Sequence, residues 1–420
     1  MTTFKGDVVV VGGGIGGMAA ALALSLKGFN VQLFEKHSKF GEVGAGLQIA
    51  PNCTRILDYW GVLQEVKDAG VLPSGMKMLD AMDGHVITEM DLRDMEKRYG
   101  YPYMVIHRSD LHRILMEAAA RAGATLHNDK GCVSYENTED GARAVFEDGD
   151  VAEGKIVIAA DGLHSVARAM MSDDEPVNSA YVAYRGAFPI GEVADHHVYP
   201  DDVVVYIGPG RHFVQYGLRG GEMFNQVAVF ESPKALAGEQ DWGTPDELDA
   251  AFAGSCEAIQ EGLPLMWRDR WWRMFDREPI MNWVDGRIAL LGDAAHPPLQ
   301  YIAQGAIMAI QDAYVMAEHA ERSRQEKGSV DGDAVLAAYN AVRPEHCRRV
   351  LTTSRKWGEL WHLPQPEAGL RNALLEARDT YDYSFTDWLY GGTALTPEEE
   401  PELFTPLSIQ DDPQKAWQGR

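Results

Sequence analysis

The chain has 420 residues, of which 45% are hydrophobic and 24% are charged, and this composition excludes a wholly disordered protein. Its 63 acidic side chains outnumber its 38 basic ones, so the formal net charge is −25. That charge argues against nucleic acid or an anionic membrane surface as a partner, because both attract positive side chains. The length is typical of two or three domains, or of one large interleaved unit.

The four cysteines, at positions 53, 132, 256 and 347, lie far apart. They form no CxxC pair or His/Cys cluster, so we expect no bound metal, and such sparse cysteines are typical of a reducing cytosol. The polar first residues lead directly into a strand and glycines, which predicts no signal peptide. No apolar run reaches the roughly 18–20 residues of a membrane span, so we expect a soluble cytoplasmic protein.

The first 35 residues predict a strand, a tight turn, a helix and a second strand. Asp7-Val8-Val9-Val10-Val11 is apolar on both faces, as in a buried parallel strand. Gly12-Gly13-Gly14-Ile15-Gly16-Gly17 follows, and residues 18–27 favour a helix that Gly28 ends. Residues 31–35 are the second strand.

The pattern Gly12-x-Gly14-x-x-Gly17 carries the first chemical signal. The first glycine permits the tight turn, the second lets the backbone approach a pyrophosphate, and the third lets the helix pack on the strand. The helix N-terminus offers free N–H groups to the phosphates. Glu35 follows at the end of the second strand, where a carboxylate accepts from ribose hydroxyls. Together they predict an adenine dinucleotide, without separating FAD from NAD.

The middle of the chain changes to short strands punctuated by Gly and Pro, which predicts a mostly antiparallel sheet for the substrate. These strands are expected around residues 181–188, 203–207, 212–218 and 225–230. A strand at 287–291 and a helix at 303–320 then resume the first domain. We therefore expect an α/β (α+β) fold, with a Rossmann-like dinucleotide-binding domain, a second β-sheet domain and C-terminal helices.

The expected boundaries divide the chain into four segments. They are 1–180 for the first part of the nucleotide-binding domain, 181–280 for the substrate sheet, 281–362 for the resumed domain, and 363–420 for a C-terminal extension. Residues 397–402 form an acidic, proline-flanked run, which we interpret as a solvated tail.

Two later motifs each place an aspartate at the carboxyl end of an apolar strand, where ligands of such sheets bind. One is Asp161-Gly162-x-x-Ser165-x-x-Arg168, and the other is Gly292-Asp293-Ala294-Ala295-His296-Pro297. With the glycine motif, they resemble the single-component flavoprotein aromatic hydroxylases, the para-hydroxybenzoate and salicylate hydroxylase superfamily. The resemblance implies that the dinucleotide is FAD.

The resemblance also implies roles for individual residues. Asp293 would hold the ribityl chain, Asp161 would serve both FAD and the nicotinamide cofactor, and Arg108 would lie near the pyrophosphate. Helix capping by the two aspartates and a surface salt bridge by the arginine are the alternative interpretations. The remaining expected FAD-binding residues are Gly12, Gly14, Gly17, Glu35 and Lys36.

Longer stretches resemble the 3-hydroxybenzoate 6-hydroxylases, which produce gentisate (2,5-dihydroxybenzoate). They are residues 40–48, 183–186, 212–216, 225–233, 269–272, 293–301 and 357–362. Gln304 and Gly217 depart from the pattern of that group, and both lie beside the expected substrate site. Gln48 stands where hydroxypyridine-acting relatives carry His, which disfavours that substrate class.

The implied reaction transfers oxygen from a flavin hydroperoxide to an electron-rich ring. Deprotonating a phenol enriches its ring, so a base is needed, and histidine is the usual one. We expect His212 as this base or as the hydrogen-bond partner of the phenol. Tyr216, on the same strand face, would orient the substrate. Gln300 would aim the phenol from the loop after Asp293, while His296 is interpreted as a structural turn residue.

The sequence thus predicts an FAD-dependent monooxygenase that converts 3-hydroxybenzoate to gentisate with dioxygen and NADH. Salicylate or another phenolic acid is the alternative substrate, and an FAD-dependent oxidase or dehydrogenase, or a non-catalytic flavoprotein, is the alternative class. No second glycine motif is found, so NADH, or NADPH, would bind transiently. A homodimer is expected by resemblance. Arg185 and Tyr301 remain alternatives for receiving the substrate carboxylate.

Overall fold

The computed structural model describes residues 1–40, 45–193 and 196–392. The expected tail at 397–402 lies outside the described residues, as does part of the stretch 40–48. None of the helices in the described part of the chain is both long enough and apolar enough to cross a membrane.

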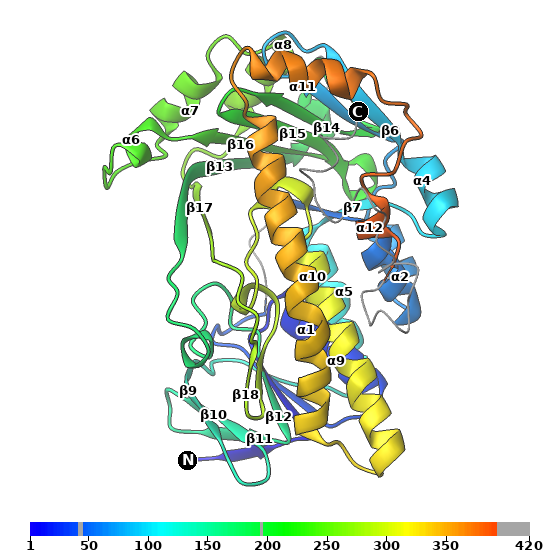
Figure 1. The fold of residues 1–420 in the computed structure, drawn as a ribbon, viewed down its shortest axis with the longest axis vertical. Coiled ribbons are helices and arrows are strands. Elements are labelled where there is room, and N and C mark those ends of the chain that lie inside the picture. Colours follow the sequence, from blue (N-terminus) through cyan, green and yellow to red (C-terminus); the bar gives the residue numbers. More distant parts are fainter. Residues whose placement is uncertain (41–44, 194–195, 393–420) are drawn as a thin grey trace.

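A six-stranded sheet forms the lower half of the molecule and contains the predicted strand–turn–helix–strand unit (Figure 1). Its first strand, Val8–Val11, is fully buried, as expected for a strand that is covered on both faces. All neighbours pair in parallel except β18, which is antiparallel to β19. In spatial order the strands are β18 (Val284–Asp285), β19 (Ile288–Leu290), β12 (Ile156–Ala159), β2 (Val8–Val11), β3 (Val31–Phe34) and β8 (Thr125–His127).

Helices cover one side of this sheet, and a small sheet contacts it on the other (Figure 1). Helix α1 (Ile15–Leu26) is rich in alanine, and this lets it pack closely between α5 (Arg108–Arg121) and α9 (Gly305–Lys327). Gly28, with φ of +78°, follows the last turn of α1. The small sheet consists of β1 (Thr3–Lys5), β11 (Val151–Gly154), β10 (Ala142–Phe146) and β9 (Cys132–Asn137).

A seven-stranded sheet forms the upper half and is antiparallel apart from the β14–β5 pair. In spatial order it contains β17 (Trp272–Asp276), β13 (Val177–Pro189), β16 (Met223–Glu231), β15 (Arg211–Leu218), β14 (Asp202–Gly208), β5 (Gly75–Asp80) and β6 (Val86–Asp91). The predicted α/β fold with a second, mostly antiparallel sheet is therefore confirmed. The sheet draws on more of the chain than residues 181–280, because β5 and β6 come from the first 180 residues.

Short helices cover the outer face of this second sheet, and its inner face turns toward the first half (Figure 1). Side chains such as Phe213, Phe230 and Phe252 form a separate buried cluster beneath the outer helices. These helices are α6 (Pro233–Leu236), α7 (Pro245–Phe252) and α8 (Glu257–Gly262). Alternate residues of β15 therefore face either this cluster or the opposite, inner side.

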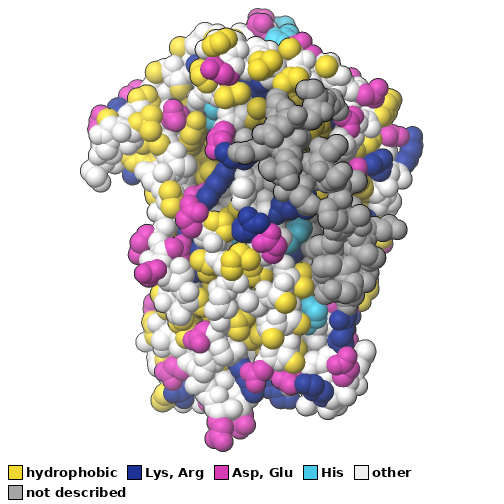
Figure 2. Space-filling model, in the orientation of Figure 1, with side chains coloured by type: hydrophobic (Ala, Val, Ile, Leu, Met, Phe, Trp, Pro, Cys, Tyr) yellow, Lys and Arg dark blue, Asp and Glu magenta, His cyan; other side chains and the backbone are white. Residues whose placement is uncertain are grey.

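Several elements join the two halves (Figure 1). The 30-residue helix α10 (Gly332–Trp361) runs from the first sheet to the second. A two-stranded antiparallel sheet, formed by β4 (Gly46–Ile49) and β7 (Met104–His107), lies between them. The remaining helices are α2 (Pro51–Tyr59), α3 (Leu63–Ala69), α4 (Leu92–Tyr99), α11 (Glu367–Glu376) and α12 (Asp387–Tyr390). On the face in Figure 2, acidic side chains are spread among basic ones, so its described residues form no broad basic patch.

Candidate active site

The glycine-rich turn between β2 and α1 has a tight geometry that other residues do not fit. Gly12 has φ of +111°, and a Cβ on Gly17 would lie only 1.8 Å from the carbonyl oxygen of Gly12. Gly14 is the N-cap of α1 and offers no side chain to the first amides of the helix. Gly14, Ile15 and Gly16 line a large cavity, so the N-terminus of α1 faces it as a ready anion site.

Glu35 lies beside this turn, at the end of β3. Its Oε2 accepts from the amide of Gly13 (2.7 Å) and its Oε1 from the amide of His37 (3.0 Å). These bonds fix the carboxylate beside the turn, and its remaining lone pairs are available to ribose hydroxyls. Lys36 is exposed and is not among the residues that line the cavity. The structure therefore brings Glu35 to the glycine turn and leaves Lys36 at the surface.

Arg108 and Asp293 both line the same cavity, and their charges interact. Arg108 is the first residue of α5, where the side chain of His107 accepts from the amide of Ser109. Asp293 lies in a short 3₁₀ turn, Gly292–Ala294, after β19, and it is exposed. Burial lowers the pKa of Arg108, and the nearby charge of Asp293 opposes this shift. One cation and one anion thus line the lower cavity, which offers both a partner for an anionic group and an acceptor for hydroxyl groups.

Asp161 closes the turn after β12, and the neighbouring Ala160 and Gly162 line the cavity. Its Oδ2 accepts from the hydroxyl of Tyr135 (3.0 Å) and from the amide of Val166 (3.0 Å). Its Oδ1 is buried without a hydrogen-bond partner among the described residues. An unpaired buried acceptor is costly, and this one is suited to accept from a bound ligand.

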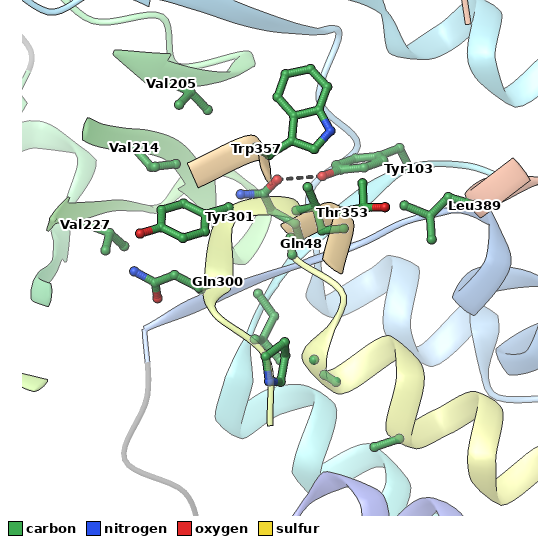
Figure 3. Close-up of a pocket in the computed structure, with 18 of the residues that line it drawn as sticks. Gln48, Tyr103, Val205, Val214, Val227, Gln300, Tyr301, Thr353, Trp357 and Leu389 are labelled. Carbon is green, nitrogen blue, oxygen red and sulfur yellow. Dashed lines mark hydrogen bonds between the residues drawn. The ribbon is translucent and has the colours of Figure 1, made fainter. Parts of the chain in front are cut away.

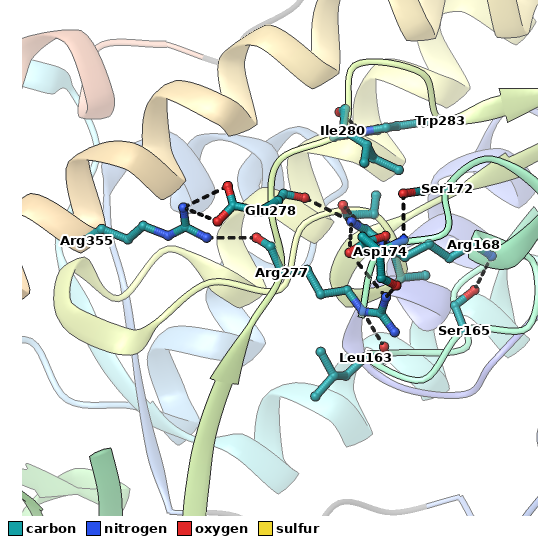
Figure 4. Close-up of polar contacts among 12 residues, drawn as sticks. Leu163, Ser165, Arg168, Ser172, Asp174, Arg277, Glu278, Ile280, Trp283 and Arg355 are labelled. Carbon is teal, nitrogen blue, oxygen red and sulfur yellow. Dashed lines mark hydrogen bonds and ion pairs between the residues drawn. The ribbon is translucent and has the colours of Figure 1, made fainter. Parts of the chain in front are cut away.

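Arg168 links the two aspartate motifs to each other (Figure 4). Its Nη1 donates to the carbonyl oxygens of Ala294 (3.1 Å) and Ala295 (2.6 Å), and its Nε pairs with Asp174 (2.8 Å). Arg277 donates to the same Asp174 and to the carbonyl of Leu163. The sequence motif included Arg168 but gave it no role. In the structure it fixes the loop of Asp293 against the loop of Asp161.

A second buried network supports the Asp293 loop from behind. Oδ2 of Asp312 accepts from the amide of Gly292 (3.0 Å) and from Nε2 of His296 (2.5 Å), and Oδ1 accepts from Nε of Arg343 (2.7 Å). The paired charges raise the pKa of His296 and lower that of Asp312. His296 is thus buried behind the loop, which agrees with a structural role. His296, Asp312 and Cys347 lie close enough together to hold a metal ion. However, the guanidinium of Arg343 contacts both Asp312 and Cys347, and its positive charge disfavours a cation at this position.

The cavity continues upward into a chamber beneath the second sheet, and the whole has a volume of about 570 Å³. The chamber has mostly apolar walls (Figure 3). Three valines of the sheet form its ceiling, and α10 and α12 supply its outer wall. These residues are Val205, Val214, Val227, Thr353, Trp357, Trp361, Leu389 and Tyr390. Such a lining suits a flat aromatic molecule and excludes bulk water.

A few polar groups converge on this chamber. Nη2 of Arg185 donates to Oε1 of Gln300 (3.1 Å), and the guanidinium lies over the ring of Trp272 at 5.5 Å. On another wall, the hydroxyl of Tyr103 donates to Oε1 of Gln48 at 2.5 Å (Figure 3). A guanidinium has no acceptor, so its bond fixes which end of the Gln300 amide is oxygen.

His212 and Tyr216 lie on one face of β15, and both line the cavity as their spacing predicted. The Tyr216 ring fits against β4 only because residue 46 is glycine, where a Cβ would lie 2.3 Å from the ring. Burial raises the pKa of the Tyr216 hydroxyl and lowers that of the His212 imidazole well below its usual value. Nδ1 of His212 lies 2.9 Å from Nε2 of His362. A neutral His212 therefore faces the cavity with its other nitrogen.

The structure brings together the predicted residues His212, Tyr216, Gln300, Arg108 and Asp293 around one cavity. Sequence reasoning gave no role to Tyr103 or to His362, although His362 lies in the singled-out stretch 357–362. No motif marks Tyr103, which reaches the chamber only through the pairing of β7 with β4. Gly358 of the same stretch lets Tyr301 pack on α10, since a Cβ there would lie 2.4 Å from the Tyr301 ring.

Comparisons with known proteins agree with this geometry. The model of the FAD binding domain family matches residues 5–354. A 3-hydroxybenzoate 6-hydroxylase of Aquipseudomonas alcaligenes is 35% identical over 393 residues, which is 92% of this chain and 97% of the relative. A 3-amino-4-hydroxybenzoate 2-monooxygenase of Streptomyces cremeus is 33% identical over 398 residues, with coverage of 93% and 96%.

A solved salicylate hydroxylase substrate complex shares the fold, with a TM-score of 0.75 and 25% identity. The match covers 96% of this chain and 98% of the other. The resemblance predicted from the three motifs is thereby confirmed. The chain belongs to the FAD-binding family of aromatic hydroxylases, and it is an FAD-dependent aromatic monooxygenase.

Proposed function

We propose that this enzyme hydroxylates 3-hydroxybenzoate to gentisate, using NADH and dioxygen. The observation that carries the proposal is one continuous cavity with two chemically different ends. Its lower end presents the glycine turn and Asp293, and its upper end presents Arg185, His212 and Gln300. The relative named 3-hydroxybenzoate 6-hydroxylase supports this choice of substrate.

The residues of the lower end fit FAD. Gly14 and Gly16 of the glycine turn line the cavity, Glu35 lies beside that turn where a ribose would reach it, and the buried Oδ1 of Asp161 needs a donor. Gly14 and Gly16 would hold the pyrophosphate beside Arg108, and Asp293 would hold the ribityl chain. When bound, FAD supplies the redox chemistry: it takes hydride from the nicotinamide and delivers oxygen from dioxygen to the ring.

The chamber attracts an anion because the charge of Arg185 lacks an acidic partner among the described contacts. Its guanidinium touches Gln300 and the Trp272 ring, and both are neutral. Lys77 also lines the cavity, but Glu89 and Asp202 each lie 3.2 Å from its Nζ. We therefore assign the substrate carboxylate to Arg185.

The phenolic end of the substrate would then contact His212, Gln300 and Tyr216. A neutral imidazole is the form that accepts a proton, and burial keeps His212 neutral. Oε1 of Gln300 accepts from Arg185, and its Nε2 makes a long, weak contact with Sδ of Met274 (3.9 Å) that a stronger acceptor can replace, so we assign Nε2 as the donor to the phenolate oxygen. The Tyr216 hydroxyl, which burial keeps protonated, is a further donor that orients the ring.

The reaction balances as follows. One ring C–H becomes C–OH, NADH and a proton yield NAD⁺, and the two atoms of dioxygen end in the new hydroxyl and in one water. The valines of the ceiling and the tryptophans of the outer wall give the chamber a mostly apolar lining, which would limit the access of water to the oxygen being transferred. NADH would bind only transiently, since the described fold contains one glycine-rich dinucleotide turn, which the proposal assigns to FAD.

A substrate panel tests the proposal. FAD-loaded protein is mixed with NADH and each isomer of hydroxybenzoate, and NADH consumption and product identity are recorded together by absorbance and mass spectrometry. We expect 3-hydroxybenzoate to stimulate NADH oxidation most strongly and to yield gentisate. If salicylate, and not 3-hydroxybenzoate, stimulates NADH oxidation and is hydroxylated, the substrate is the alternative one. Reduction of the flavin by substrate alone, without nicotinamide, would overturn the monooxygenase assignment.

A further inference from the structure

Two imidazole rings form a hydrogen-bonded pair at the back of the chamber. Nδ1 of His212 lies 2.9 Å from Nε2 of His362, and the ring planes are 18° from parallel. His212 comes from β15 of the second sheet, and His362 is the C-cap of α10. One nitrogen must carry the hydrogen and the other must accept it, so the two rings are joined end to end.

The pair runs outward from the cavity. His212 lines the cavity and is 1% exposed, whereas His362 lies behind it and retains 9% of its surface. A proton taken up by His212 therefore has almost no direct route to water. The neighbouring ring of His362 is a base within hydrogen-bond distance that lies nearer the surface.

The surroundings of His362 keep it neutral. Tyr181 of β13 stacks on it at 4.7 Å and Tyr301 meets it edge-on at 5.5 Å. Arg371 of α11 donates to the carbonyls of residues 360 and 361, and burial together with this charge lowers the pKa of His362 to about 3. Glu231 interacts with the hydroxyl of Tyr181, and the charge that acts on His362 itself is that of Arg371. Neither imidazole thus retains an extra proton.

We propose that His212 and His362 form a proton relay that carries the phenolic proton of the bound substrate out of the chamber. The inference rests on the proposed function, in which His212 receives that proton. The phenolic O–H bond breaks and a bond to Nε2 of His212 forms. The proton on Nδ1 of His212 passes to Nε2 of His362, and the proton on Nδ1 of His362 passes to water or buffer.

Each ring begins and ends neutral in this sequence, with its hydrogen on the other nitrogen at the end. The phenolate remains in the chamber, and its charge faces Arg185 through Gln300. A transfer between two neutral imidazoles agrees with the depressed pKa of both rings, because no imidazolium needs to persist. The stretch 357–362 already supplies two tryptophans of the chamber wall, and the relay adds a role for its last residue.

Proton release on binding tests the relay without turnover. Oxidised, FAD-loaded enzyme is mixed with 3-hydroxybenzoate in weak buffer with a pH indicator dye, in a stopped-flow instrument at mildly alkaline pH. Wild-type enzyme should release a proton, and 3-methoxybenzoate, which has no phenolic proton, should release none. His362→Gln should slow the proton release by at least about tenfold, which is the contribution typical of a positioned acid or base. The Kd of this variant for 3-hydroxybenzoate should change by less than about threefold.

Tyr181→Phe is the matched control, because it keeps the ring that stacks on His362 and removes only a hydroxyl. It should release the proton at the wild-type rate. Should His362→Gln lose FAD or fold poorly, His362→Ala is used instead, with imidazole added to the buffer to restore the release. Unchanged release in His362→Gln, or a failure of imidazole to restore it in His362→Ala, overturns the relay. A wild-type enzyme that releases no proton and yields no hydroxylated product overturns the proposed function itself.

Discussion

Replacing Arg185 by methionine should weaken the binding of 3-hydroxybenzoate and leave FAD in place. Methionine keeps an unbranched apolar stem beside Trp272 and removes the charge. Two unit charges 4 Å apart interact by about 4 kcal/mol at an effective dielectric constant near 20. Loss of water from the half-buried guanidinium offsets part of this, so about 1.5–3 kcal/mol remains for a hydrogen bond to a charged group. The Kd should therefore rise by a factor of about 10 to 150.

The assay is an equilibrium titration of oxidised holoenzyme followed by the flavin absorbance. 3-Hydroxybenzyl alcohol, which lacks the carboxylate, is the matched ligand, and its affinity should not change with the substitution. Lys77→Met is the matched protein control, because Lys77 lines the same cavity but its charge is already paired twice. This control should shift the Kd for 3-hydroxybenzoate by less than about threefold, as expected for a neutralised surface charge.

The assignment of the carboxylate to Arg185 is refuted if Arg185→Met binds 3-hydroxybenzoate as tightly as wild type. It is equally refuted if the variant loses affinity for the acid and the alcohol to the same extent, since the effect would then be one of packing. Arg185→Lys separates charge from geometry and should recover part of the lost affinity, because a lysine keeps the charge without the bidentate fork.

Three further substitutions and one pH dependence test other parts of the site. His212→Ala should retain FAD and lose at least about tenfold in hydroxylation rate, measured by gentisate formation, and an unchanged rate would remove it from the mechanism. Asp293→Ala should lose FAD on dialysis, whereas a fully loaded variant would contradict its assignment to the ribityl chain. Asp312→Asn should lower the free energy of unfolding by about 3–5 kcal/mol in urea titrations, because it leaves buried cations uncompensated. In the wild type, the raised pKa of His296 stabilises the fold fully below its usual pKa, and this is lost as pH rises through the folded value. The lowered pKa of Asp312 stabilises the fold above the usual pKa of an aspartate, and this stabilisation is lost as pH falls through the folded value. The free energy of unfolding of the wild type should therefore decline at both acidic and alkaline pH. In Asp312→Asn the acidic decline due to Asp312 should be absent.

The local part of the fold could be predicted because short segments specify it. Four consecutive valines require a strand that is buried on both faces, and the glycines after them permit only a tight turn. Four of the seven strands of the second sheet, β13 to β16, were also predicted to within a few residues, since their alternation and turn residues are local signals, whereas β5, β6 and β17 were not predicted. The period of two in β15 placed His212 and Tyr216 on one face, and both line the cavity.

Long-range pairing could not be predicted in the same way. The parallel pairing of β5 with β14 joins residues more than a hundred positions apart, and no short pattern marks it. For the same reason, the sequence around Arg168 did not predict that its guanidinium donates to the carbonyl oxygens of the Asp293 loop. Tertiary packing alone brings Tyr103 to the chamber and His362 to the far side of His212. The resemblance named the cofactor residues, but the polar partners that orient them emerged only from the coordinates.

Helix α10 sets a fixed separation between the Asp293 loop and the chamber, the two ends of the cavity that we assign to cofactor and substrate. Arg343 near its middle holds the acid behind the Asp293 loop, while Trp361 at its end walls the chamber. Eighteen residues separate the two positions, a span of about 27 Å along a helix. A single inserted residue between them would turn the tryptophan by about 100° and advance it by about 1.5 Å. Exchanging side chains on the last turns of α10 would therefore change which substrates fit the chamber. A change in the length of α10 would instead misalign the proposed flavin and substrate positions.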